Sequence, residues 1–393
     1  MSIESRSDAK RIHRSKVRKV HAGWIVFIAG FLLMLFGAEA ISTTRPDTAT
    51  HQLRLGAVGM LFAFVIAFVP QRRFRQASWW LYVLSLLLLL FLLIPGIPDF
   101  IVHPRNGARR WINFGFIDMQ PSEIMKIAFI LAMASHLRFK KHYRAFKGLV
   151  LALFVAIPPM LLVLDEPDLG TAMLFLPSLI AMLIVAGARY RHLIIIAILA
   201  TIAASSMYQM LQPHQKGRIK ALIAQIQGDD RYEQSIGYQG ARAMTLIGAG
   251  QLTGVGKERA QELLMANHLP EEHNDMIFAV ITLRWGFWGA LGLWSLYGLF
   301  GIGGIISAIG CKDPFPRLVA VGITAMIISQ MIINTAMTLG LAPITGLTLP
   351  FVSAGGSSLV ITWVMAGILF GIAMRRDPLM TREGFSFSDE GMM

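Results

Sequence analysis

The chain has 393 residues, of which 55% are hydrophobic and only 15% charged; soluble domains carry about 25% charged residues, so a soluble protein is excluded and a polytopic membrane protein indicated. The 36 basic and 23 acidic residues give a net charge of +13, which would suggest nucleic acid in a soluble protein, but here the basic residues lie in short loops that set membrane orientation. The single cysteine, Cys311, excludes a disulfide framework and a cysteine metal cluster.

Ten apolar runs of membrane-spanning length predict an all-α polytopic membrane protein with ten transmembrane helices. They cover residues 23–41, 52–69, 79–95, 123–138, 148–164, 170–187, 191–208, 276–306, 315–340 and 352–374. We therefore expect one ten-span domain over residues 23–374, flanked by a basic cytoplasmic tail at 1–22 and a second cytoplasmic tail at 375–393. A large loop, residues 209–275, separates the seventh span from the eighth.

The basic residues predict which loops are cytoplasmic. In a ten-span topology the basic N-terminal tail, the basic loops and the C-terminal arginines fall on one face, and such segments stay in the cytoplasm. The residues concerned outside the tail are Arg72, Arg73, Arg75, Arg138, Lys140, Lys141, Arg144, Lys147, Arg189, Arg191, Lys312, Arg317, Arg375 and Arg376. Both termini are thus expected in the cytoplasm, and the polar segments 97–122, 165–169 and 209–275 outside it.

The first outer segment contains adjacent arginines beside a tryptophan, Arg109, Arg110 and Trp111. A guanidinium group can donate bidentate hydrogen bonds to phosphate oxygens, and an indole favours the membrane interface. This run is typical of an anionic headgroup site. The alternative is simple anchoring at the interface, which the residues alone do not exclude.

The start of the fourth span places two opposite charges together. Pro121 and Ser122 are typical of a helix start, and Glu123 and Lys126 are three residues apart, on one helical face. Charges inside a membrane are rare and face the bundle interior, which favours a ligand role. The alternative is a local ion pair that shields both charges from lipid.

The turn between the fifth and sixth spans carries three acids in four residues, Asp165, Glu166 and Asp168. Such a cluster could bind a cation or sugar hydroxyls. The alternative is that Asp168 caps the sixth span, since acidic residues are favoured at helix N-termini. On either interpretation Asp168 is expected at the extracytoplasmic face.

Asp275 lies where the large polar loop enters the eighth span. A carboxylate at such a border is desolvated on one side and reachable from the other, which favours a raised pKa and a role in proton transfer. The alternative is a helix N-cap. The topology brings Asp275 and the polar residues above, from separate chain segments, to one membrane face, and a shared site explains this convergence.

The motifs NGARRW, QPSE, EPDLGTA, LPEEHNDMIFAV and TGLTLPFVSAGGSS, in this order between about residues 100 and 374, resemble the shape, elongation, division and sporulation (SEDS) family that includes RodA, FtsW and SpoVE. The resemblance implies a ten-span peptidoglycan glycosyltransferase of the bacterial plasma membrane. Its substrate would be lipid II, a disaccharide-pentapeptide on undecaprenyl pyrophosphate. Its partner would be a class B penicillin-binding protein in an elongation or division complex.

The resemblance also implies roles for residues. Asp275 matches the family's essential aspartate, which would activate the acceptor hydroxyl as a general base. The residues that match the family's substrate-binding motifs are Arg109, Arg110, Trp111, Glu123, Lys126 and Asp168. Glycosyl transfer from a pyrophosphate needs such a base and a cationic group for the leaving group. No cofactor is certain, and a divalent cation, Mg²⁺ or Mn²⁺, could supply part of that charge.

The sequence departs from the family in three places. Arg284 stands where the family usually has an acidic pair, Arg242 and Ala243 replace a Gln-Ser, and Ala354 replaces a tyrosine. On a straight helix Arg284 would lie about 13 Å beyond Asp275, where a cation needs a partner that the sequence does not identify. The alternatives to the enzyme are a lipid II flippase and an inactive scaffold. The choice between a RodA and an FtsW paralogue stays open.

Overall fold

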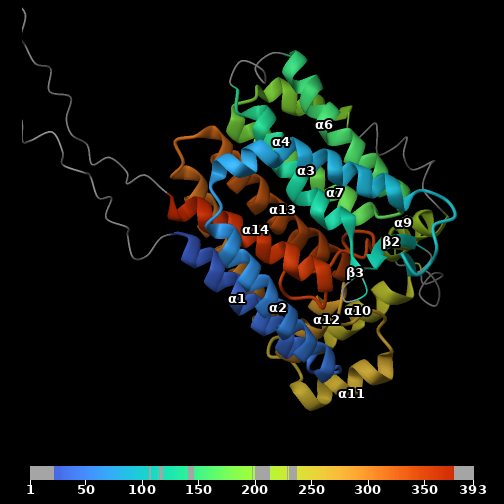
Figure 1. Ribbon diagram of the computed structural model, residues 1–393. Coiled ribbons are helices and arrows are strands. Elements are labelled where there is room, and N and C mark those ends of the chain that lie inside the picture. The colour runs from blue at the N-terminus through green and yellow to red at the C-terminus, as the bar shows by residue number, and fades with distance from the viewer. Residues whose placement is uncertain are drawn as a thin grey trace, which may run out of the picture.

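The computed structural model describes residues 22–105, 108–113, 115, 118–139, 146–196, 198–199, 213–227, 229 and 237–375. They form a bundle of long helices with a small sheet and shorter helices gathered at one end (Figure 1). In chain order the elements are α1 (Ala22–Ile41), α2 (Pro46–Ala67), α3 (Gln71–Leu92), β1 (Val102–Arg105), β2 (Ala108–Asn113), β3 (Asp118–Met119), α4 (Pro121–Leu137), α6 (Phe146–Asp165), α7 (Leu169–Ala186), α9 (Pro213–Ile226), α10 (Tyr238–Gly250), α11 (Lys257–Asn267), α12 (Ile277–Ile309), α13 (Pro314–Thr338) and α14 (Gly356–Met374).

The all-α membrane fold is confirmed. Seven of the described helices, α1, α2, α3, α7, α12, α13 and α14, are long and apolar enough to cross a membrane. Helices α4 and α6 coincide with the fourth and fifth predicted spans. The seventh predicted span, 191–208, lies mainly outside the described residues, so the count of ten spans stays a prediction.

Two helices begin earlier than the apolar runs predict. Helix α2 starts at Pro46 and α3 at Gln71, six and eight residues before the expected positions 52 and 79. Their first turns are polar, with Asp47 in α2 and Arg72 and Arg73 in α3. An apolar-run criterion excludes such turns, although the helix continues through them to the membrane surface.

The two spans α2 and α14 touch at backbone level on one side of the bundle, beside α1 (Figure 1). A Cβ at Gly367 or Gly371 in α14 would overlap the carbonyl oxygen of Ala63 or Ala67 in α2. Glycine is therefore required for this approach.

Helix α4 is buried along almost its whole length, because it packs against α3, α6, α7 and α13. Its N-terminal turn lies at one end of the bundle, where α1, α6 and α13 end and α7 and α14 begin. We call this end of the bundle the loop end. The charges predicted at the start of the fourth span therefore lie in the bundle interior.

A three-stranded antiparallel sheet stands at the loop end, in the segment between α3 and α4. The sequence analysis did not predict it. Strand β2 carries Arg109, Arg110 and Trp111 in consecutive positions, and successive side chains in a strand point to opposite faces. The strand thus sends the two adjacent arginines in different directions.

Helix α12 breaks at Gly286, whose backbone is non-helical with φ of 65°. The break lies against Leu252 and Gly254, and a Cβ at Gly286 would stand 2.5 Å from their backbone atoms. The first nine residues, 277–285, thus form a separate short helix. Arg284 at its end meets Glu39, at the loop end of α1. Arg284 precedes the break, so it lies along the short helix as predicted, and Glu39 is the partner that the sequence does not identify.

Candidate active site

Asp275 lies at the loop end, directly before the short helix 277–285, and is 7% exposed. Its carbonyl accepts a hydrogen bond of 2.8 Å from Asn334 Nδ2 on α13. The preceding carbonyl, that of Asn274, accepts one of 2.6 Å from Ser353 Oγ. Met276 rather than Asp275 occupies the N-cap position. The backbone around the carboxyl is therefore held from two other segments.

The environment of Asp275 raises its pKa to about 7. Burial is the largest cause, and the negative charge of Glu271 adds to it. Backbone N–H groups and the positive charge of Arg218 act in the opposite direction without cancelling it. A carboxyl with such a pKa exchanges its proton near neutral pH, as a general base must.

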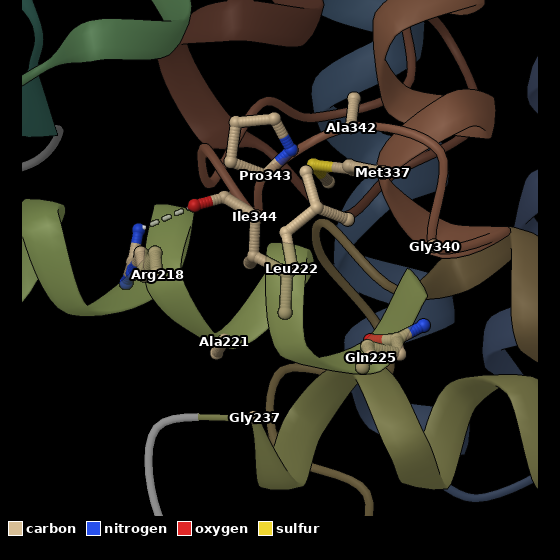
Figure 2. A pocket seen from close by; sticks show the side chains of 11 residues that line it. Arg218, Ala221, Leu222, Gln225, Gly237, Met337, Gly340, Ala342, Pro343 and Ile344 are labelled. Atoms are coloured by element: carbon tan, nitrogen blue, oxygen red, sulfur yellow. Dashed lines mark hydrogen bonds between the residues drawn. The ribbon is translucent and has the colours of Figure 1, made fainter. Parts of the chain in front are cut away.

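Arg218 on α9 is a member of this site that the sequence analysis did not single out. Its Nη1 donates a hydrogen bond of 2.8 Å to the carbonyl of Ile344, in the loop after α13 (Figure 2). Burial lowers the pKa of Arg218, Asp275 opposes that change and Arg110 reinforces it. The charges of both residues therefore reach Arg218, and all three share one electrostatic environment.

Arg110 on β2 binds the turn between α6 and α7. Its Nε donates to the carbonyl of Glu166 at 2.6 Å, and its Nη2 donates to that of Pro167. Its Nη1 is 4.0 Å from Asp168 Oδ2. The predicted headgroup-binding arginine and the predicted acidic turn are thus in contact.

Asp168 caps α7, as the alternative interpretation predicts. Its Oδ1 accepts from the Thr171 backbone N–H at 3.1 Å, and its Oδ2 accepts from Thr171 Oγ1 at 2.9 Å. Gln120 Nε2 donates to the same Oδ2 at 3.2 Å. These contacts fix the carboxylate beside Arg110 and leave it little freedom to rearrange around a ligand.

Arg109 points away from these groups. Its Nη2 bonds the carbonyl of Ile97 and Asp99 Oδ1, the latter at 2.9 Å, both in the segment before β1. Trp111, next along the strand, is half-buried and lines a cleft of about 450 Å³. Other residues lining this cleft are His51, Gln52, Asp118, His273, Asn274 and Ser357.

Glu123 and Lys126 form a buried ion pair with a Nζ–Oε2 distance of 2.8 Å and side chains 6% and 2% exposed. Lys126 Nζ also donates to Gln330 Oε1 on α13 at 3.2 Å. Gln330 is one helical turn, about 6 Å, from Asn334, which holds the Asp275 carbonyl. Helix α13 therefore connects the ion pair to Asp275.

Glu166 is a second buried carboxyl, 2% exposed, and neither of its oxygens has a hydrogen-bond partner. Burial raises its pKa to about 9, Asp168 adds to the effect and Arg110 opposes it. At neutral pH the side chain is therefore protonated and uncharged. In the sequence, Glu166 is only one of three acids in the turn. Nothing in the neighbouring residues indicates which of the three side chains is buried.

We expect Glu166→Gln to stabilise the protein at pH 7. The folded pKa lies above the unfolded value of about 4.5, so folding at pH 7 requires uptake of a proton, at a cost of at most about 3 kcal/mol. This cost grows as the pH rises from about 4.5 to about 9, and glutamine removes it. Melting temperatures in detergent at pH 5 and pH 8 measure the change. A gain that is equal at both pH values would contradict a protonated Glu166, and Glu166→Ala controls for lost packing.

The structure brings Asp275, Arg218, Arg110 and Asp168 into one group and places the Glu123–Lys126 pair against the same face of α13. Arg109 does not join them. Within the described ranges, no three His, Cys, Asp or Glu side chains gather as a metal site. The described residues thus offer no set of three such ligands to a cation, and no step below passes through one.

Comparison with known proteins gives one consistent result. The profile of the FtsW, RodA and SpoVE family, described as cell cycle proteins, matches residues 20–377. Stage V sporulation protein E of Bacillus subtilis is 33% identical over 351 residues, which are 87% of this chain and 92% of that protein. Peptidoglycan glycosyltransferase MrdB of Helicobacter pylori is 33% identical over 353 residues, 88% of this chain and 86% of that one.

A solved structure has the same fold. It belongs to a peptidoglycan synthase complex that coordinates polymerization and crosslinking, and it superposes with a TM-score of 0.75 at 28% identity. The match covers 90% of this chain and 98% of that one. The similarity therefore extends over most of the molecule.

Proposed function

Because this chain belongs to the FtsW, RodA and SpoVE family, we propose that it is a peptidoglycan glycosyltransferase that polymerises lipid II, with Asp275 as the general base. The observation that carries this assignment is the buried carboxyl of Asp275, whose pKa is near neutrality and which lies in the field of Arg218. The protein works in the bacterial plasma membrane, with both termini in the cytoplasm and the loop end outside.

The reaction needs a proton acceptor and a place for negative charge. The acceptor hydroxyl passes its proton to the Asp275 carboxylate while its oxygen attacks the anomeric carbon of the donor sugar. The bond from that carbon to the pyrophosphate oxygen breaks, and the lipid pyrophosphate leaves with the electron pair. One displacement inverts the anomeric carbon and needs no protein nucleophile.

The arginines stabilise the negative charge of the leaving group. Arg218 lies in the field of Asp275, and Arg110 acts on Arg218 and lies beside Asp168. Both arginines are partly exposed, so phosphate oxygens can accept their hydrogen bonds. Lys126 is 2% exposed and already paired, so it supports the site through Gln330. Trp111 offers an aromatic face to a sugar in the neighbouring cleft.

The direct test is polymerisation of lipid II by the purified protein in detergent, read as glycan ladders on a gel. Detergent removes the two sides of a membrane, so a flippase alone gives no polymer. The reaction is run with Mg²⁺, with Mn²⁺ and with a chelator, which tests a divalent cation brought by the substrate's pyrophosphate. Absence of polymer from folded protein under all three conditions would reject the proposed activity.

We expect kcat/KM to rise with pH up to about 7 and then to level off. Asp275 acts only when deprotonated, so below its pKa the rate falls by about tenfold per pH unit. Initial rates of lipid II polymerisation between about pH 5.5 and 9 measure the profile. Glu166→Gln is the matched control. It removes the other carboxyl with a raised pKa, and the rise of kcat/KM between about pH 5.5 and 7 should remain. A profile that is flat across this range would contradict the role of Asp275.

The proposed partner is a class B penicillin-binding protein. The structurally similar chain comes from a synthase complex that couples polymerization to crosslinking, and glycan strands from a polymerase need a transpeptidase to be crosslinked. Polymerisation rates with and without such a partner test the pairing. They also test the inactive-scaffold alternative, which predicts no polymer in either case.

A further inference from the structure

The far end of the short helix 277–285 contacts α1 through two residues, Trp285, whose ring centre lies 4.9 Å from that of Phe36, and Arg284. Arg284 donates from Nη1 to the Glu39 carbonyl at 2.6 Å and from Nη2 to Glu39 Oε1 at 2.5 Å. Its Nη1 also reaches Thr43 Oγ1 at 3.2 Å, and its guanidinium lies 4.2 Å from the centre of the Trp285 ring. The Arg284 side chain is only 10% exposed, so these contacts define its position.

The short helix connects this contact to Asp275. Residues 277–283 are all buried, which prevents the helix from bending into solvent. At its far end, the Val255 N–H donates to the carbonyl of Leu283 and the Gly256 N–H to that of Arg284. At its near end, Asn334 holds the Asp275 carbonyl. A displacement at Arg284 is therefore transmitted along a rigid segment of nine residues to the carboxyl.

The same two parts of the chain meet at weaker points nearby. Arg45 Nε is 3.8 Å from Glu272 Oε1, with the arginine side chain 54% exposed, and Lys257 Nζ is 3.5 Å from Ser42 Oγ. Long contacts with an exposed partner contribute little. Glu39 is itself 54% exposed, but its carbonyl and its carboxylate both accept from the largely buried guanidinium of Arg284. Among the described polar contacts between the α1–α2 corner and this loop, the Glu39–Arg284 pair is thus the one with the most fixed geometry.

We propose that the Glu39–Arg284 pair is a positioning contact that fixes the short helix against α1 and so holds the Asp275 carboxyl in its buried setting. The inference rests on the proposed function only for its effect on the reaction. Its geometric part can be tested without any activity. Arg284 and Glu39 act through the helix and touch no substrate.

The first experiment measures the exposure of position 275. Asp275→Cys is made in a Cys311→Ser background, so that the introduced thiol is the single one, and its labelling by a soluble maleimide is timed. Adding Arg284→Ala should speed labelling by about tenfold, since the helix end is released. Arg259→Ala is the matched control: its ion pair with Glu262 is 2.6 Å long but more than 60% exposed on both sides, and labelling should not change.

The second experiment exchanges the charges. With the natural residue at position 275, Arg284→Glu should lower kcat for lipid II by about 10- to 100-fold with KM within about twofold, since a misplaced base impairs reaction more than binding. Glu39→Arg combined with Arg284→Glu should recover part of kcat, because it re-forms the side-chain ion pair but not the hydrogen bond to the carbonyl of residue 39. Melting temperatures show which variants are folded.

The outcomes separate this inference from the proposed function. If the parent forms no polymer while Arg284→Ala still speeds labelling, the proposed activity fails and the positioning contact stands. If labelling of folded Arg284→Ala equals that of the parent, the positioning contact is rejected whatever the activity. A folded charge exchange that restores no activity likewise overturns it, because the pairing is then not what matters.

Discussion

Asp275→Asn is expected to lower lipid II polymerisation by roughly 100- to 10,000-fold, the range typical of a lost general base. Asparagine has almost the same shape but cannot accept the hydroxyl proton. The hydrogen bonds from Asn334 and Ser353 go to main-chain carbonyls of residues 275 and 274, so they survive the substitution. The loss should therefore appear in kcat, with the melting temperature unchanged or raised.

A matched control for this variant is Asp313→Asn, the same substitution at the start of α13, far along that helix from Asn334. The Asp313 side chain caps α13 by accepting from the Phe315 backbone N–H at 3.0 Å, and asparagine caps a helix equally well. This substitution should have a far smaller effect on kcat. Asp275→Asn protein that is folded and polymerises at the parent's rate would remove Asp275 from the mechanism.

Lys126→Met is expected to destabilise the protein by roughly 3–5 kcal/mol, because it leaves Glu123 buried without its partner. Methionine replaces most of the apolar stem, so the effect isolates the missing charge. The pair is among the most buried charged groups described, at 6% and 2% side-chain exposure. Thermal unfolding in detergent, followed by intrinsic fluorescence, measures the loss.

The double variant Glu123→Gln and Lys126→Met removes both charges together. Uncharged replacements of a buried pair are often near neutral in stability, so it should recover most of the melting temperature. Its activity then reports on the reaction alone, and we expect it to stay low, since Gln330 loses the ammonium that it accepts from. A single Lys126→Met variant as stable as the parent would show that the pair contributes little to the fold.

The sequence predicts the parts of the site that depend on local pattern. Neighbouring residues are enough to predict the border position of Asp275 and the helical face that Glu123 and Lys126 share. They also predict the cap formed by Asp168. Apolar runs likewise predict the described long helices of the bundle to within a few residues, except where a polar first turn precedes the run. They do not predict α9, α10 and α11 in the large loop.

The remaining features depend on segments far apart in the chain. Arg218 lies in an ordinary amphipathic helix, and only the folded chain shows that its charge meets that of Asp275. The partner of Arg284 is 245 residues away. The bend that follows it is encoded only by Gly286, a single glycine in an otherwise helical run. The separation of Arg109 from Arg110 follows from an extended strand in a segment that the hydropathy pattern leaves undefined.

The backbone contact of α14 with α2 has a mechanical consequence. Two ribbons that touch through Gly367 and Gly371, with no side chains between them, cannot slide past each other without colliding with the carbonyls of Ala63 and Ala67. Helices α2 and α14 therefore move together as one rigid unit. Any widening that admits the lipid tail of the proposed substrate is therefore expected on the other side of the bundle, where α6 packs against α3 and α7.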